Sequence, residues 1–197
     1  MRFEFLIILI LSVLIFAGCS KTEDRSVEEM SQVKMKYKCL GNLQIPFQKT
    51  FSYDLDDDGK KDLFITSQLI GKPSEQSDYQ SYYFMGGSST YSPIDVEDQT
   101  PVLNAGDIIG EDMNLNHEWY NVPQVCIAEK IIPISGNDYW QGKWKDVSHK
   151  YLAFALKKDG KYTYGWLELS FSKNLGTVIL HCIGFAEESG KNVIAGK

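Results

Sequence analysis

Short β-like runs recur along this chain, and they constrain its fold more than any other feature. They are separated by Gly, Asp, Asn, Ser and Pro residues, which is the pattern of a sandwich or barrel and not of a βαβ fold. The 11 Tyr, 10 Phe and 4 Trp residues favour such pleated, half-buried surfaces. We therefore predict an all-β fold, a single jelly-roll-like β-sandwich over residues 35–197. The expected strands are 48–54, 63–69, 80–85, 107–109, 125–134, 151–156, 162–172 and 177–187.

A hairpin is the clearest local prediction. Asp159-Gly160 supplies the positive φ angles that a tight turn requires, so strands 151–156 and 162–172 should pair through residues 157–160. Successive side chains of a strand point to opposite faces. One face of the second strand then carries Leu167, Leu169 and Phe171, and the other carries Tyr162, Tyr164 and Trp166.

The aromatic face of that strand has two interpretations. Flat rings on a rigid sheet can stack against sugars, which would make Tyr162, Tyr164 and Trp166 a ligand platform. A two-layer sandwich packs most of its aromatic side chains in the core or in an interface, and this interpretation is favoured. The same two interpretations apply to three aromatic residues of a later loop, Tyr139, Trp140 and Trp144.

An aspartate-rich loop carries the clearest chemical signal. Counting from Asp54, aspartates occupy positions one, three, five and nine, and Gly59 occupies position six. Calcium prefers six to eight oxygen ligands in a flexible cage, and glycine permits the sharp turn that wraps them around one point. We therefore predict a structural Ca²⁺ site. Its expected ligands are Asp54, Asp56, Asp58, the backbone carbonyl of Lys60, and Asp62 directly or through water.

This loop is not an EF-hand. Ile65 stands at position twelve, where an EF-hand has a bidentate glutamate, and both flanking segments are β-like. The competing interpretation is a solvated acidic turn, in which Lys60 and Lys61 relieve part of the repulsion. The predicted role is to stabilise the loop, because catalytic metal sites keep an open position beside an acid or base.

Residues 1–18 have the features of a lipoprotein signal peptide. Arg2 precedes an apolar run over residues 5–16, which is shorter than the roughly 20 residues that span a bilayer. The run ends in Phe16-Ala17-Gly18-Cys19, which resembles the lipobox of bacterial lipoproteins, whose cysteine is acylated and becomes the mature N-terminus. The alternative is an ordinary secretory signal that contains a cysteine.

The lipoprotein interpretation sets the expected location and partners. Two or more acyl chains on Cys19 anchor a protein stably, and the charged segment 19–34 has the composition of a flexible tether. We expect a cell-envelope protein at the outer membrane, with its periplasmic or surface face undecided. The net charge of −6 argues against a nucleic-acid partner. The membrane, through the lipid, and a glycan or an envelope protein are the expected partners.

Three cysteines remain after Cys19. In an oxidising compartment Cys39, Cys126 and Cys182 permit one disulfide and one free thiol, and all three pairings stay open. Cys126 and Cys182 lie in apolar runs, where a cysteine is also at home as a small buried hydrophobe.

The sequence contains no recognised catalytic constellation. The three histidines, His117, His149 and His181, lack the spacing of a metal-binding pair. His181 lies in an apolar strand, where a hydrogen-bonded structural role is expected. A glycosidase needs two carboxyl groups flanking one bond. The residues available for such a pair are Glu111, Asp112, Glu118 and Glu168. We therefore expect a non-enzymatic binding or structural module, with a polysaccharide-acting enzyme or accessory subunit as the alternative.

Three segments together resemble uncharacterised, Bacteroidetes-like lipoproteins and other exported bacterial β-sandwich proteins. The first is the Asp loop ending in Asp62-Leu63-Phe64, which resembles the Ca²⁺ loops of FG-GAP repeats. The second is 103–110 (LNAGDIIG), and the third is the tail with Tyr164-Gly165-Trp166 and Ile194-Ala195-Gly196. The resemblance implies the β-sandwich and the Ca²⁺ loop. It implies no activity.

Overall fold

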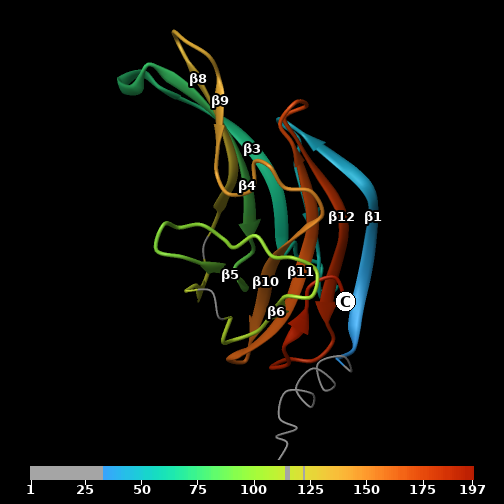
Figure 1. Cartoon of the computed structure of the whole chain (residues 1–197). Helices are drawn as coiled ribbons and strands as arrows, with labels where there is room; N and C mark the ends of the chain where they lie inside the picture. Colours follow the sequence, from blue (N-terminus) through green and yellow to red (C-terminus); the bar gives the residue numbers. More distant parts are fainter. Residues whose placement is uncertain (1–32, 114–115, 122) are drawn as a thin grey trace, which may run out of the picture.

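The chain folds as an all-β sandwich in which two antiparallel sheets pack against each other, as predicted (Figure 1). This computed structural model describes residues 33–113, 116–121 and 123–197. The expected signal peptide 1–18, Cys19 and the tether as far as residue 32 lie outside the described residues. Lys34 is already held, because its ammonium lies 2.6 Å from the Glu187 carboxylate.

The first sheet has six strands in the order β1-β12-β11-β10-β5-β7. All its neighbouring strands are antiparallel. The bounds are β1 Met35–Pro46, β12 Thr177–Ala186, β11 Lys161–Ser172, β10 Lys150–Lys158, β5 Thr90–Ile94 and β7 Glu118–Tyr120.

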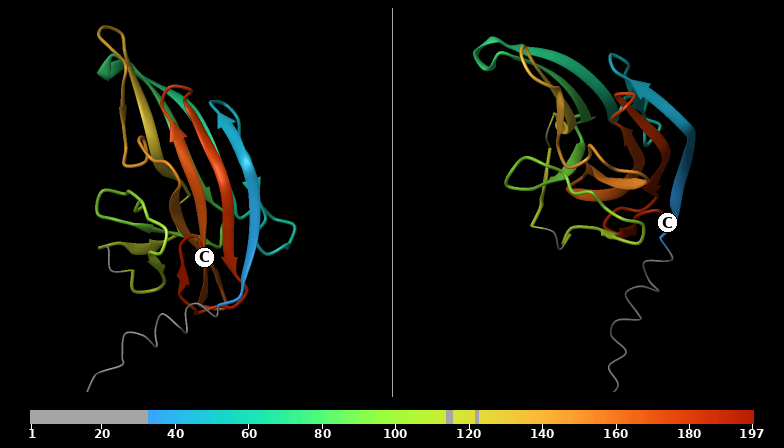
Figure 2. Two further views of the ribbon diagram at one scale, coloured as in Figure 1. Left: turned by 45° about the vertical axis from the view of Figure 1, so that its right-hand side comes forward. Right: turned by 45° about the horizontal axis from the view of Figure 1, so that its top comes forward.

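The second sheet has five strands in the order β2-β3-β4-β8-β9. Its bounds are β2 Phe51–Tyr53, β3 Leu63–Lys72, β4 Ser77–Gly86, β8 Val125–Pro133 and β9 Tyr139–Gln141. A single 3₁₀ turn, η1 (Pro73–Glu75), joins β3 to β4, and the two views of Figure 2 show this hairpin projecting beyond the sandwich. A separate short ladder pairs β6 (Ile108–Ile109) with β13 (Val193–Ile194).

The strand order refines the comparison with a jelly roll. A jelly roll consists of two Greek keys. Here the chain stays within one sheet for β2-β3-β4 and again for β10-β11-β12, so each sheet is built around a meander. The long-range pairing of β1 with β12 adds β1 as an edge strand of the first sheet.

The predicted hairpin is confirmed. Lys158 and Lys161 are the last pair of the ladder, and Asp159 and Gly160 adopt φ values of 50° and 77° between them. Positive φ at both central residues is the turn that matches the right-handed twist of paired strands.

The two faces of β11 enter two different apolar clusters, as the alternation predicted. The inner cluster lies between the sheets and is built mainly by β3, β4 and β8 on one side and β10, β11 and β12 on the other. It contains Leu167, Leu169 and Phe171. The outer cluster lies on the opposite face of β10 and β11, and it contains Tyr164 and Trp166.

Loop and C-terminal residues cover that outer face. Leu103 pairs with Tyr151 of β10, and Ile109, Met113 and Val193 pack in the same cluster. The Trp166 indole N–H donates to the carbonyl of Lys197 over 3.3 Å. The first sheet is therefore buried on both faces where β10 and β11 run.

A leucine pair tests the inner core. Leu167 is fully buried, whereas Leu175 is 66% exposed in a turn. We expect Leu167→Ala to lower the free energy of unfolding by about 2–5 kcal/mol, because it removes buried methyl groups and leaves a cavity. Leu175→Ala should change it by no more than about 0.5 kcal/mol. Urea unfolding followed by tryptophan fluorescence measures both, and equal losses would contradict the assignment.

Candidate metal centre

The Asp-rich loop connects β2 to β3 at the edge of the second sheet. Its base is closed by the pairing of Tyr53 with Leu63 and by the Asp62 N–H, which donates to the Tyr53 carbonyl over 2.9 Å. Asp57 and Gly59 adopt φ values of 60° and 88°. A Cβ at Gly59 would meet nothing within 4 Å, so glycine serves the backbone angle there and not close packing.

Backbone N–H groups orient four carboxylates of the loop. Gly59 N–H donates to Asp54 Oδ2 over 2.9 Å, and Lys60 N–H donates to Asp58 Oδ1 over 2.8 Å. Asp58 N–H donates to Asp56 Oδ1 over 3.2 Å, and Leu55 N–H donates to Asp62 Oδ2 over 2.7 Å. One oxygen of each carboxylate is thus spent on shaping the loop, which leaves the second oxygen for another partner.

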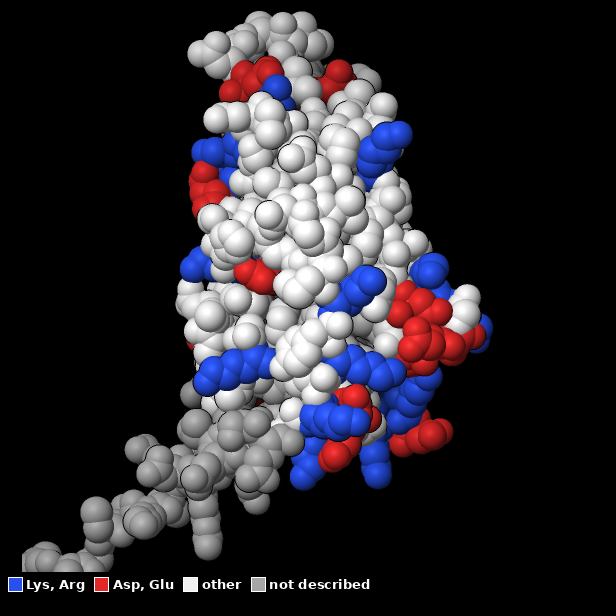
Figure 3. All heavy atoms as spheres, turned by 90° about the vertical axis from the view of Figure 1, so that its right-hand side faces the viewer, with Lys and Arg blue, Asp and Glu red and all other residues white. Residues whose placement is uncertain are grey.

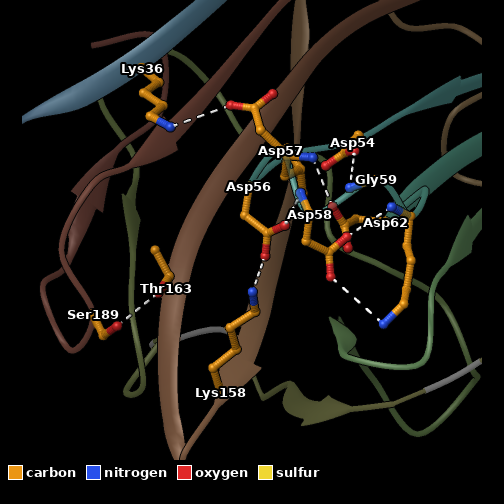
Figure 4. Close-up of polar contacts among 12 residues, drawn as sticks. Lys36, Asp54, Asp56, Asp57, Asp58, Gly59, Asp62, Lys158, Thr163 and Ser189 are labelled. Atoms are coloured by element: carbon orange, nitrogen blue, oxygen red, sulfur yellow. Dashed lines mark hydrogen bonds and ion pairs between the residues drawn. The ribbon is translucent and has the colours of Figure 1, made fainter.

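Three of the predicted ligands converge. Asp54, Asp56 and Asp58 each place one carboxylate oxygen so that all three atoms lie within 4.8 Å of one another (Figure 4). Calcium binds oxygen at about 2.3–2.6 Å, so two oxygens on one ion lie no more than about 5 Å apart. Asp54 Oδ1 is buried and has no hydrogen-bond partner. Both observations fit a hard cation bound by these carboxylates.

The remaining two predicted ligands lie differently. Asp62 is 8% exposed and does not belong to the group of three. Burial raises the pKa of its carboxyl group, the N–H of Leu55 opposes that shift, and the charges of Asp56, Asp54 and Asp58 add to it. The backbone N–H of Lys60 donates to Asp58 Oδ1, and the ammonium of Lys60 lies 3.9 Å from Asp58 Oδ2.

Two lysines of the first sheet reach this loop, and neither was predicted as part of the site. Lys158, at the end of β10, forms an ion pair with Asp56, and its hydrogen bond to that carboxylate raises its pKa. Lys36 of β1 lies 3.7 Å from Asp57. Figure 3 shows acidic and basic side chains gathered in the lower part of the β1 side of the molecule. The loop therefore ties the second sheet to the first.

A groove of about 360 Å³ adjoins the loop. Asp56 belongs to both the groove and the carboxylate group. The groove is otherwise lined by the ends of β10, β11 and β12, including Lys158, Thr163 and Phe185, and by Lys36 of β1. Thr163 Oγ1 hydrogen-bonds Ser189 Oγ over 3.0 Å at its margin (Figure 4).

The aromatic platform is not an exposed surface. Tyr164 and Trp166 are 2% and 3% exposed, and Tyr162 is half-buried against Tyr91 and Trp119. They are packed core residues because the 103–113 segment and the C-terminus cover this face of the sheet. The loop aromatics divide: Trp144 is buried in the inner core, Trp140 packs against that core, and Tyr139 is 52% exposed.

Of the four carboxylates considered for a glycosidase, two have separate partners and two share one neighbour. Glu168 contacts the His149 ring, and Glu118 accepts the hydroxyl of Tyr120 over 2.6 Å. Glu111 and Asp112 lie near Tyr164, whose pKa is raised to about 12 by burial first and then by the charges of Glu111, Tyr162 and Asp112.

A polar network that the sequence did not predict lies on the outer face of β11 and β12. Ser170 Oγ lies 2.8 Å from His181 Nε2, and His181 Nδ1 lies 2.7 Å from Asn42 Oδ1. His149 N–H donates to Ser170 Oγ over 2.9 Å, and its ring stacks on His181 with centroids 4.0 Å apart. His181 is thus a fully hydrogen-bonded strand histidine, as expected, and it holds the β1 bulge through Asn42.

Comparisons with protein-family models, with curated proteins and with solved structures found no match to this chain. In the part of the chain that the structure describes, no helix combines the length and apolar character needed to cross a membrane.

The histidine network predicts a pH dependence of stability. Burial and then the neighbouring His149 lower the pKa of His181 below its ordinary value of 6.5. His181 therefore binds a proton more readily in the unfolded chain than in the folded protein. Its contribution to the free energy of unfolding is complete above pH 6.5 and is lost as the pH falls from 6.5 through the lower pKa of the folded state. Between pH 8 and pH 5.5, the free energy of unfolding should fall less for His181→Gln than for the wild type. Denaturant titrations at both pH values measure this, and parallel pH profiles would refute it.

Proposed function

We propose that this protein is an extracytoplasmic lipoprotein, anchored in the membrane through an acylated Cys19, that acts as a non-enzymatic binding or structural module with a Ca²⁺-stabilised loop. The observation that carries the proposal is the convergence of Asp54, Asp56 and Asp58, together with the buried, unpartnered Asp54 Oδ1. A rigid sandwich presents this loop at its edge, where the two sheets are linked by Lys36 and Lys158.

Electrostatics favour a divalent cation in this loop. Two unit charges about 4 Å apart repel by about 1 kcal/mol in water and by about 4 kcal/mol at an effective dielectric constant of 20. Three carboxylates within 4.8 Å carry three such repulsions. Lys158 relieves them at Asp56, and Lys60 relieves them weakly at Asp58. A bound Ca²⁺ would remove more of this repulsion than a single ammonium group can.

The location of the loop favours a stabilising role for the ion. The loop connects β2 to β3 and contacts β1 and β10 through lysines, so fixing it fixes the junction of both sheets. The adjoining groove shares Asp56 with the carboxylate group and offers a place for a ligand beside it. Its lysines, acids and hydroxyl suit a polar partner such as a glycan or a charged segment of an envelope protein.

Calcium titration tests the metal site. We expect the full-length protein, purified in detergent and freed of metal with EDTA, to bind one Ca²⁺ by isothermal calorimetry and to melt at a higher temperature in its presence. Asp56→Asn should weaken binding at least about tenfold, because it removes one ligand charge. Asp138→Asn, which changes an exposed aspartate paired with Lys130, is the matched control and should bind normally. Absence of binding at millimolar Ca²⁺ would remove the site.

Metabolic labelling tests the anchor separately. Cells expressing the protein and fed an alkyne-bearing fatty acid should yield a labelled protein in the membrane fraction. Cys19→Ser should abolish the label, because this thiol is the expected acylation point. Cys126→Ser is the matched control and should keep it. An unlabelled wild-type protein in the cytosolic fraction would disprove the proposed location without bearing on the metal site.

A further inference from the structure

The pairing of β1 with β12 brings two cysteines face to face. Cys39 and Cys182 are direct partners in the antiparallel register. Facing residues of neighbouring strands point to the same side of a sheet, with Cβ atoms about 4.5–5.5 Å apart. A disulfide needs Cα atoms about 4.4–6.8 Å apart and Cβ atoms about 3.5–4.5 Å apart, so a small adjustment closes the bond. The Cys39 thiol is near enough to raise the pKa of Cys182.

Cys126 is not an alternative partner for either thiol. It lies on β8 of the second sheet, where it faces Tyr83, and its thiol contacts the Ala128 carbonyl at 3.7 Å. Burial raises the pKa of the Cys126 thiol to about 12, which disfavours the reactive thiolate. The three pairings that the sequence left open are thereby reduced to one.

We propose that Cys39 and Cys182 form a disulfide that fastens the edge strand β1 to β12. The step joins the two sulfur atoms and releases two protons and two electrons. A disulfide-bearing oxidant, such as a thiol–disulfide oxidoreductase or oxidised glutathione, accepts them and becomes two thiols. Cys39 is exposed and reacts first to give a mixed disulfide, and Cys182 then displaces the oxidant's second thiol.

The position of the pair explains what the bond would do. The β1–β12 ladder is regular from Met35 to Cys39, is interrupted, and resumes at Leu43. Leu40, Gly41 and Asn42 form the interruption, and the last two have positive φ. Of the twelve residues of β1, Ile45 alone is fully buried, so apolar burial holds the strand weakly. A bond at Cys39 fastens the strand where its ladder breaks, and it also closes a very long loop of chain.

The order of reaction follows from the surroundings of the two thiols. Burial first and the contact with Cys39 second raise the pKa of Cys182 to about 11. Cys182 is half-buried, so an oxidant reaches it less easily than Cys39. The exposed thiol therefore captures the oxidant, and its neighbour resolves the mixed disulfide.

Peptide mapping of the full-length protein tests the bond. After equilibration with oxidised glutathione, alkylation and proteolysis without reductant, we expect a cross-linked peptide pair containing Cys39 and Cys182. Cys126→Ser should keep this pair, and Cys182→Ser should lose it. Recovery of Cys39 and Cys182 as separate alkylated peptides, or a bridge that includes Cys126, would overturn the proposal.

Thermal melting provides a second measurement, whose main comparison uses only the wild-type protein with and without reductant. The oxidised wild type should melt roughly 5–15 °C above the same sample in reductant, because the bond restricts the unfolded chain. Cys126→Ser should show the same rise, and Cys182→Ser should show none. Equal melting temperatures with and without reductant would contradict the stabilising role. These outcomes do not depend on acylation of Cys19 or on Ca²⁺.

Discussion

Burial of both faces of the β10–β11 hairpin is the constraint on which the rest of the structure depends. The inner face packs against the second sheet, and the outer face is covered by the 103–113 segment and β13. The Tyr-Gly-Trp motif of β11 is consequently a packing device. A Cβ on Gly165 would lie 2.6 Å from the Phe154 ring, and one on Gly184 would overlap the ring of Trp166. Large aromatic rings therefore occupy the space that glycines leave open on neighbouring strands. Because this packing buries the rings, they do not form an exposed sugar-binding surface.

This double burial decides which strands could be predicted. The runs at 151–156, 162–172 and 177–187 are apolar or alternating, and they match β10, β11 and β12 closely because the core dictates their side chains. β1 was missed because nine of its twelve positions are exposed, and because its pairing with β12 is a long-range contact that the local sequence pattern does not report. β5, β7, β9 and β13 are two to five residues long, too short to show a period.

The Asp-rich loop likewise combines features that local sequence predicts with features that only long-range contacts create. Asp54, Asp56 and Asp58 lie at alternate positions of one tight turn, so their spacing alone predicts that they converge. Asp62 closes the base of the loop instead, because the N–H of Leu55 binds its carboxylate. Lys158 is about a hundred residues away in sequence, and the sandwich brings it to Asp56. A lysine at the end of a strand carries no local signal of such a role.

Three side-chain attachments hold β1 in addition to its ladder with β12. Lys36 reaches Asp57 on an exposed surface, where an ion pair contributes little. His181 Nδ1 lies 2.7 Å from Asn42 Oδ1 in the bulge, and burial lowers the pKa of this ring. The facing thiols of Cys39 and Cys182 lie at the end of the regular ladder, next to the bulge. An edge strand with a free side and little buried area needs such local attachments, because the hydrophobic core alone does not specify its register. The Lys34–Glu187 ion pair adds a further attachment directly before Met35, where this strand begins.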